Sequence, residues 1–138
     1  MMRFFIPLIC LITLFSCSKE KRYTKALKGT WQIELVKLQD NEGFSFFDKQ
    51  AVGSLVIDDD QLVSGAIYSS FAGNSGQLLD TFQLAGHYFL TLKNEEINFV
   101  LGQDTLKARL LLLTNSDLEF EYYNALKSKR VRYIFKKV

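Results

Sequence analysis

The sequence predicts an all-β protein after residue 28, an eight-stranded antiparallel up-and-down barrel. Apolar and polar residues alternate in segment after segment, which is the period of a half-buried strand. Most segments are joined by short turns, and none shows the apolar spacing of a helix of the usual length. Such a meander forms either a sandwich or a closed barrel. Closure is favoured because it removes the exposed edges of a free meander.

The first strand begins at the only tryptophan of the chain. Trp31, Ile33 and Leu35 alternate with Gln32 and Glu34, and the phase changes near Val36. A phase change inside a strand is typical of a β-bulge. We expect Trp31 to close one end of the barrel.

Seven further strands follow. They are centred on residues 55–57 and lie at 62–71, 80–92, 97–101, 104–113, 118–122 and 131–135. Alternation directs one set of side chains into the barrel, where they are candidates for lining a ligand site. With the first strand, this set is Trp31, Ile33, Phe82, Leu84, Tyr88, Leu90, Phe99, Leu110, Phe120, Tyr122 and Tyr133. No charged residue falls inward on the clearest strands, so a ligand is expected to be apolar or held by uncharged donors.

The outer face of the last two strands carries opposite charges. Glu119 and Glu121 face outward on one strand, and Arg130 and Arg132 do so on the next. Cross-strand ion pairs explain these four residues better than a pair of catalytic acids does.

The connections differ between the two ends of the barrel. One end receives residues 40–52, 72–79, 102–103 and 124–128, and we call it the mouth. The other receives the tight turns at 58–61, 93–95 and 114–116 together with Trp31, and we call it the floor. Phe44, Phe46 and Phe47 in the first mouth connection form either a movable cover over a ligand or a plug of an ordinary core, because apolar loop residues serve both purposes.

Residues 1–16 do not belong to the barrel. A positive start precedes an apolar run at residues 4–16, which is too short to span a hydrocarbon core of ~30 Å and is typical of a secretory signal. Its end, Leu14-Phe15-Ser16-Cys17, resembles the lipobox of bacterial lipoproteins. The resemblance implies a diacylglyceryl group on Cys17, and a Gram-negative envelope protein sorted to the outer membrane. The alternative is an ordinary signal peptide that is cut elsewhere.

Residues 17–28 follow as a short, basic and polar segment. We interpret it as a lipidated tether between the membrane and the domain at residues 29–138. Residues 23–27 can also form a helical turn that closes the floor, and the two interpretations are compatible.

Composition excludes several classes of site. With Cys10 in the signal and Cys17 lipidated, no thiol remains for a disulfide or a thiolate metal site. The 17 basic and 15 acidic residues nearly balance, which argues against a nucleic-acid partner.

The polar residues do not form a catalytic or metal-binding pattern. Residues 58–60 are three consecutive Asp, which suits a hairpin turn better than the alternating ligands of a calcium loop. His87 is the only histidine and lacks a companion acid. The familiar hydrolase and phosphate-loop motifs are not found. We therefore expect no enzyme, no cofactor and no metal.

Gly29-Thr30-Trp31, preceded by Leu27, resembles the Gly-x-Trp start of lipocalins and fatty-acid-binding proteins. It looks most like the lipocalin-like domains of small bacterial lipoproteins. Lipocalins pack an Arg from the last strand on this Trp, whereas that position here offers only Lys136 and Lys137. The fatty-acid site is not carried over, because alternation turns Arg130 and Arg132 away from the interior.

Two functions therefore remain open. The first is a membrane-anchored module that binds a small apolar ligand in the barrel. The second is an interaction lipoprotein with a filled barrel that docks a protein partner of the envelope. An eight-stranded barrel permits both, because its interior either is filled by side chains or holds one small ligand.

Overall fold

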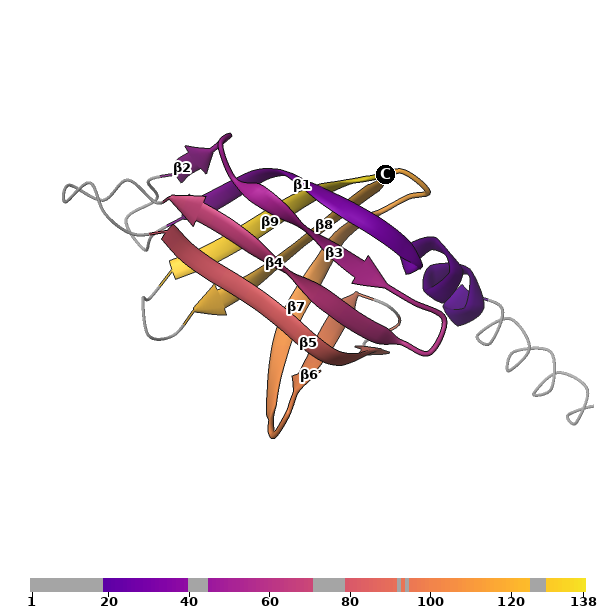
Figure 1. Ribbon diagram of the computed structural model, residues 1–138. Coiled ribbons are helices and arrows are strands. Elements are labelled where there is room, and N and C mark those ends of the chain that lie inside the picture. Colours follow the sequence, from indigo (N-terminus) through magenta and orange to yellow (C-terminus); the bar gives the residue numbers. More distant parts are fainter. Residues whose placement is uncertain (1–18, 40–44, 71–78, 92, 94, 125–128) are drawn as a thin grey trace, which may run out of the picture.

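The computed structural model describes residues 19–39, 45–70, 79–91, 93, 95–124 and 129–138. Its strands close into an antiparallel barrel, as predicted (Figure 1). Pairing of the first strand with the last closes the sheet. The strands are β1 Gly29–Gln39, β2 Ser45–Asp48, β3 Val52–Ile57, β4 Leu62–Ser70, β5 Leu79–Thr91, β6 Glu96–Leu101, β7 Asp104–Leu113, β8 Asp117–Asn124 and β9 Lys129–Lys137.

The short strand β2 lies where the sequence predicted only a loop. Residues 36–39 of β1 pair with β9 on one side and with β2 on the other. β3 pairs with residues 29–32 of β1. β2 and β3 therefore lie along the same edge of β1, one after the other. We interpret β2 and β3 as two halves of one barrel strand that is interrupted at residues 49–51. The eight-strand prediction holds for the barrel wall, and the prediction of a structureless connection over 40–52 is wrong at 45–48.

The predicted bulge in β1 is present. The register of β1 against β9 shifts between Ile33 and Leu35. Consequently Ile33 and Val36 are both buried, while Leu35 is only half-buried. A bulge inserts one residue and redirects the side chains that follow it, which explains the change of phase in the sequence.

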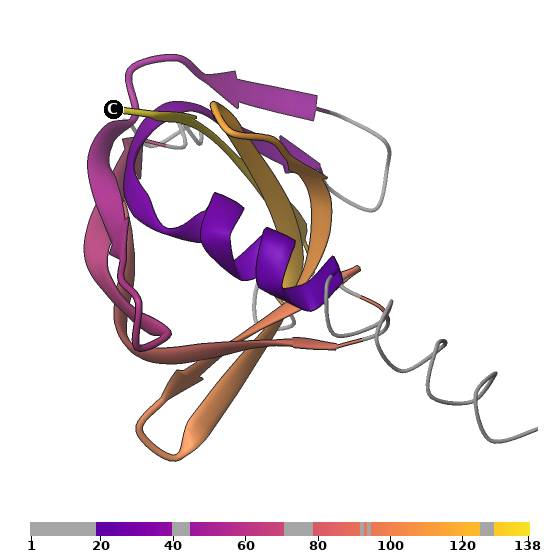
Figure 2. The same ribbon diagram turned by 90° about the vertical axis from the view of Figure 1, so that its right-hand side faces the viewer.

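A helix at residues 19–27 precedes the barrel. It lies across the floor, where Figure 2 looks onto it. The part of the chain described by the structure contains no helix long and apolar enough to cross a membrane.

The predicted face of β8 and β9 is also confirmed. Glu121 pairs with Arg132 in the register, and an Arg132 nitrogen lies 3.1 Å from a Glu121 carboxylate oxygen. Nearer the floor, Lys136 pairs with Asp117 and donates to its carboxylate. Exposed pairs of this kind contribute only ~0.2–1 kcal/mol each.

We predict a measurable acid dependence at the Asp117 pair. Hydrogen bonds from Lys136 and Ser116 lower the pKa of Asp117 from 3.8 to about 2. Because the folded pKa lies below the ordinary one, the pair stabilises the fold above pH 3.8, and this contribution is lost as the pH falls through about 2. Carboxyl NMR titration should find the low pKa, and Lys136→Gln should raise it. An unchanged pKa in that variant would refute the assignment.

Candidate functional site

The floor of the barrel is sealed from within. Trp31 and Leu27 are fully buried, and the Trp31 indole Nε1 donates a 2.7 Å hydrogen bond to the carbonyl oxygen of Leu27. This bond satisfies one of the carbonyls that remain unpaired at the end of a helix. Helix 19–27 and the first strand are thereby fixed to each other over the interior.

Lys137 completes the floor. Its Nζ atom lies 4.9 Å from the centroid of the Trp31 ring and donates a 2.9 Å hydrogen bond to the carbonyl oxygen of Ala26. A cation over an indole face is a favourable cation–π contact. Lys137 therefore occupies the place that the lipocalin resemblance assigns to an arginine.

The glycine of the Gly-Thr-Trp sequence makes room for this lysine. A Cβ atom at Gly29 would lie 2.7 Å from Cε of Lys137, and the φ angle of Gly29 is 137°. A side chain at this position would be strained and would displace the lysine from Trp31.

Aromatic rings bridge the middle of the barrel. β5 and β9 are four strands apart in either direction around the closed sheet, so they form opposite walls. Nevertheless, the ring centroids of Phe82 on β5 and Tyr133 on β9 lie only 4.5 Å apart. Phe120 continues this contact toward the floor, with centroids 5.3 Å from Phe99 and 5.6 Å from Phe135. Side chains therefore fill the interior between this ring cluster and the floor.

The predicted inward residues all contribute to this interior. Those that are buried are Trp31, Ile33, Phe82, Leu84, Tyr88, Phe99, Phe120 and Tyr133. Those that are half-buried against them are Leu90, Leu110 and Tyr122. Their common direction follows from strand alternation, and whether any of them contacts a ligand stays a prediction.

The predicted mouth cover is only partly described. Phe44 lies outside the described residues, and so does the side chain of Phe46. Phe47 is 58% exposed, and its ring lies 5.5 Å from Nζ of Lys37 on the outer surface. Pairing with β1 directs Asp48 inward and Phe47 outward, and whether the three Phe residues form a cover stays a prediction.

Asp48, like Ser69 on β4, is a buried polar residue of the mouth half that sequence reasoning missed. Its side chain is 8% exposed, and Oδ1 accepts a 2.8 Å hydrogen bond from the backbone nitrogen of Gln50. Oδ2 is buried and has no hydrogen-bond partner among the residues that the structure describes. A buried acceptor without a partner costs free energy comparable to a lost hydrogen bond. The mouth half of the barrel thus contains an unused acceptor among apolar side chains.

Tyr88 carries a second buried oxygen, close to the floor and beside the Thr24 hydroxyl. Burial raises the pKa of Tyr88, while the neighbouring Thr24 hydroxyl lowers it and the charge of Asp58 raises it further. The hydroxyl lies below the ring cluster, in the part of the interior that side chains fill, so we do not assign it to a ligand.

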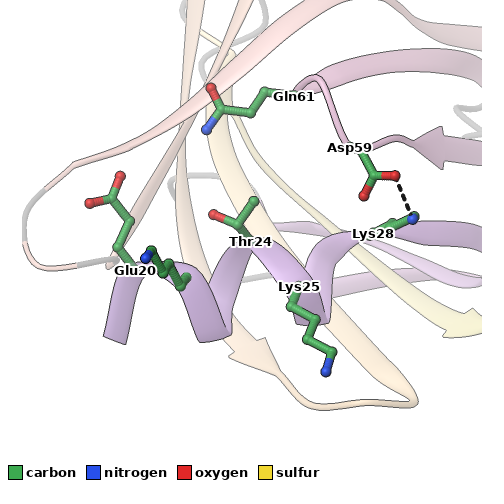
Figure 3. A pocket seen from close by; sticks show the side chains of 7 residues that line it. Glu20, Thr24, Lys25, Lys28, Asp59 and Gln61 are labelled. Atoms are coloured by element: carbon green, nitrogen blue, oxygen red, sulfur yellow. Dashed lines mark hydrogen bonds and ion pairs between the residues drawn. The ribbon is translucent and has the colours of Figure 1, made fainter. Parts of the chain in front are cut away.

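Two hollows on the outside flank the floor helix. One lies between the helix and the turn after β3, where Lys28 and Asp59 form a 2.6 Å ion pair (Figure 3). The other lies between the helix and the turn that joins β7 to β8. Among the described residues, no group of three or more His, Cys, Asp and Glu side chains could hold a metal ion.

No family model and no curated protein matches the chain. Among solved structures, a redesigned beta barrel is similar at 14% identity and a TM-score of 0.47, covering 85% of this chain and 96% of that one. The odorant-binding protein from bovine nasal mucosa is similar at 14% identity and a TM-score of 0.43, covering 82% and 72%. A deswapped triple mutant of bovine odorant-binding protein is similar at 14% identity and a TM-score of 0.41, covering 82% of this chain and 74% of that one. The strand pairing of the chain itself shows the closed barrel.

Proposed function

We propose that the barrel binds a small apolar molecule that carries one hydrogen-bond donor or positive charge. The binding site lies in the mouth half, above the ring cluster. The observation that carries this proposal is the buried, unpartnered Oδ2 atom of Asp48. A mostly apolar interior with one placed polar group is typical of small-molecule sites.

The position of the binding site follows from the part of the barrel interior that side chains fill. The Phe82–Tyr133 contact limits a ligand to the space on the mouth side of these rings. Inward side chains of that half are mainly apolar, with Leu38, Ala51 and Val131 buried. Asp48 revises the expectation that only uncharged groups hold the ligand, because a carboxylate accepts hydrogen bonds and attracts cations.

Two dyes with the same rings test this proposal. N-phenyl-1-naphthylamine offers an apolar body and one N–H donor, and 8-anilino-1-naphthalenesulfonate adds an anionic group to the same body. We expect the amine to bind residues 18–138 with enhanced fluorescence, and the sulfonate to bind at least tenfold more weakly because of Asp48. Asp48→Asn should reduce the difference in affinity between the two dyes. Asp104→Asn, at an exposed position of β7, should leave that difference in affinity unchanged.

Phe82→Trp enlarges a ring at the bottom of the site. If this variant binds neither dye, the result would further support a binding site in the mouth half. If neither dye binds, or if both bind equally in the native protein and in Asp48→Asn, the ligand proposal is wrong. Circular dichroism of each variant shows that the fold is retained.

We also propose that a lipid on Cys17 anchors the protein to the outer membrane of a Gram-negative cell. The lipobox-like Leu14-Phe15-Ser16-Cys17 supports this location. Helix 19–27 follows within two residues and lies on the floor, so the mouth would face away from the anchoring membrane. We expect Cys17→Ser to abolish labelling by radioactive palmitate in cells and to leave the signal uncleaved. Continued labelling of the variant would contradict the anchor.

Docking of an envelope protein is the second candidate, and the outer surface of β3, β4 and β5 favours it. The described outward side chains there have no formal charge: Val52, Ser54, Val56, Leu62, Ser64, Ala66, Tyr68, Gln83, Ala85, His87 and Phe89. Val52 and Tyr68 are exposed cross-strand neighbours. Tyr68→Lys should abolish binding of a partner that docks on this face, whereas Asp48→Asn should leave that binding unchanged. Binding that survives Tyr68→Lys but is lost in Asp48→Asn would exclude this face as the docking surface.

A further inference from the structure

We infer that the floor of the barrel is a docking surface for an anionic phospholipid membrane, with a headgroup phosphate held in the hollow between helix 19–27 and the β7–β8 turn. The inference adds a second membrane contact to the proposed anchor at Cys17, but its test uses protein without that anchor. Its basis is the distribution of charge around the helix and the chemistry of the hollow.

Positive charge is concentrated at the floor. Residues 19–28 contain five Lys or Arg and one Glu, whereas residues 29–138 contain 11 basic and 14 acidic residues. The cations of the helix are exposed. Because the barrel carries a net negative charge, the strongest attraction to an anionic surface is expected at the floor, and it would orient the molecule.

The two flanks of the helix differ in their charges. The flank drawn in Figure 3 includes the carboxylates of Glu20 and Asp59, and Lys28 is already paired with Asp59. The residues that line the opposite hollow include four cations and no carboxylate; they are Lys19, Arg22, Tyr23, Lys25, Ala26, Leu113, Thr114, Asn115 and Lys137. The first flank has two carboxylates against Lys21, Lys25 and Lys28, whereas the second has four cations and no carboxylate. The second flank therefore offers the larger uncompensated positive charge.

The acid at the start of β8, beside this hollow, does not cancel the charge. Asp117 accepts hydrogen bonds from Lys136 and Ser116. Its Oδ2 atom also accepts a 3.1 Å hydrogen bond from the Thr114 hydroxyl. Because these neighbours already occupy the carboxylate, Lys19 and Arg22 remain available to an external anion.

The hollow suits an amphiphilic anion better than a free ion. Lys19 and Arg22 provide N–H donors for phosphate oxygens, and Arg binds phosphate in a bidentate manner. Tyr23 and Leu113 provide apolar surface in the same hollow. Aromatic rings with a polar tip favour the interface between headgroups and acyl chains. A phospholipid in a bilayer presents both kinds of group together.

Binding to vesicles tests the inference. Residues 18–138 contain the floor helix and every described strand, and the described core lies between Leu27 and Phe135, so this fragment holds the whole barrel. Its partition is measured by sedimentation with phosphatidylcholine vesicles that contain either no phosphatidylglycerol or 30% of it. We expect binding only to the anionic vesicles, falling steeply between 50 and 300 mM salt.

A matched pair of variants locates the surface. Lys19→Gln with Arg22→Gln should weaken vesicle binding roughly thirtyfold, because each cation near an anionic membrane contributes about 1 kcal/mol. Lys107→Gln with Arg109→Gln removes one Lys and one Arg from exposed positions of β7 and should change binding less than threefold.

Equal losses in the two variants would overturn the inference, because binding would then follow net charge alone. Absence of binding to anionic vesicles would overturn it as well. Inorganic phosphate at 10 mM should not displace the vesicles beyond its effect as salt; binding of free phosphate without vesicle binding would instead assign the hollow to a soluble anion. The fragment carries no lipid, so these results are independent of the palmitate experiment and of the dye titrations.

Discussion

Trp31→Ala should destabilise the barrel by ~3–5 kcal/mol, the usual cost of truncating a buried large aromatic side chain. The variant loses a fully buried ring, and it leaves the carbonyl oxygen of Leu27 without its donor. Lys137 also loses the ring that it covers. Unfolding in urea, followed by far-UV circular dichroism, measures the change in free energy.

Trp31→Phe is the matched control, because it keeps a ring for Lys137 but removes the indole N–H. We expect a smaller loss, which comprises the hydrogen bond and part of the packing. The native protein should show blue-shifted tryptophan emission, since Trp31 is its only tryptophan. Emission typical of a fully wet indole, or a cost below ~1 kcal/mol for Trp31→Ala, would contradict the sealed floor.

Gly65→Ala should be among the most damaging exchanges of a small residue, together with the same exchange at Gly53. A Cβ atom at Gly65 would lie 2.1 Å from the backbone oxygen of Ser54 on the neighbouring strand, and the φ angle of Gly65 is 142°. The strained backbone alone costs of order 1–3 kcal/mol, and β3 and β4 must also move apart. We expect a loss of at least ~3 kcal/mol by urea unfolding, or failure to fold.

Gly102→Ala distinguishes the two causes of the expected destabilisation, which are backbone strain and the close contact between β3 and β4. Gly102 has a φ angle of 67°, but a Cβ atom there would meet nothing within 4 Å. We expect a loss of only ~1–2 kcal/mol, the cost of the left-handed conformation for a residue with a side chain. If Gly102→Ala proved as harmful as Gly65→Ala, close contact between β3 and β4 would not be the cause.

The barrel wall could be predicted because strand alternation is local. On β5, Phe82, Leu84 and Tyr88 are buried while Gln83 and His87 are exposed, as their spacing requires. The bulge in β1 was also visible, because it shifts the phase of the apolar residues. A helical turn was expected only at residues 23–27, beside the tether, whereas the helix spans residues 19–27. A short basic segment gives little periodic signal, and the position of the helix depends on the Leu27–Trp31 contact.

The positions of the polar side chains at the floor and in the mouth half could not be predicted, because they depend on residues that are distant in the sequence. Lys137 reaches Trp31 and Ala26 across more than a hundred positions of the chain. The sequence offered Lys136 and Lys137 at this position, and only the structure shows which of them contacts Trp31. Asp48 was assigned to a loop because the alternation of residues 45–57 is interrupted. Only the pairing of β2 with β1 shows that Asp48 faces the interior beside Val36.

The proposed ligand site is tested most directly by a crystal structure of residues 18–138 with N-phenyl-1-naphthylamine. We predict the naphthyl body on the mouth side of the Phe82–Tyr133 contact, with its N–H group within 3.2 Å of Oδ2 of Asp48, and with Trp31 still bonded to Leu27. A dye bound below these rings, a dye bound only on the outer surface, or an interior that excludes it would contradict the proposal.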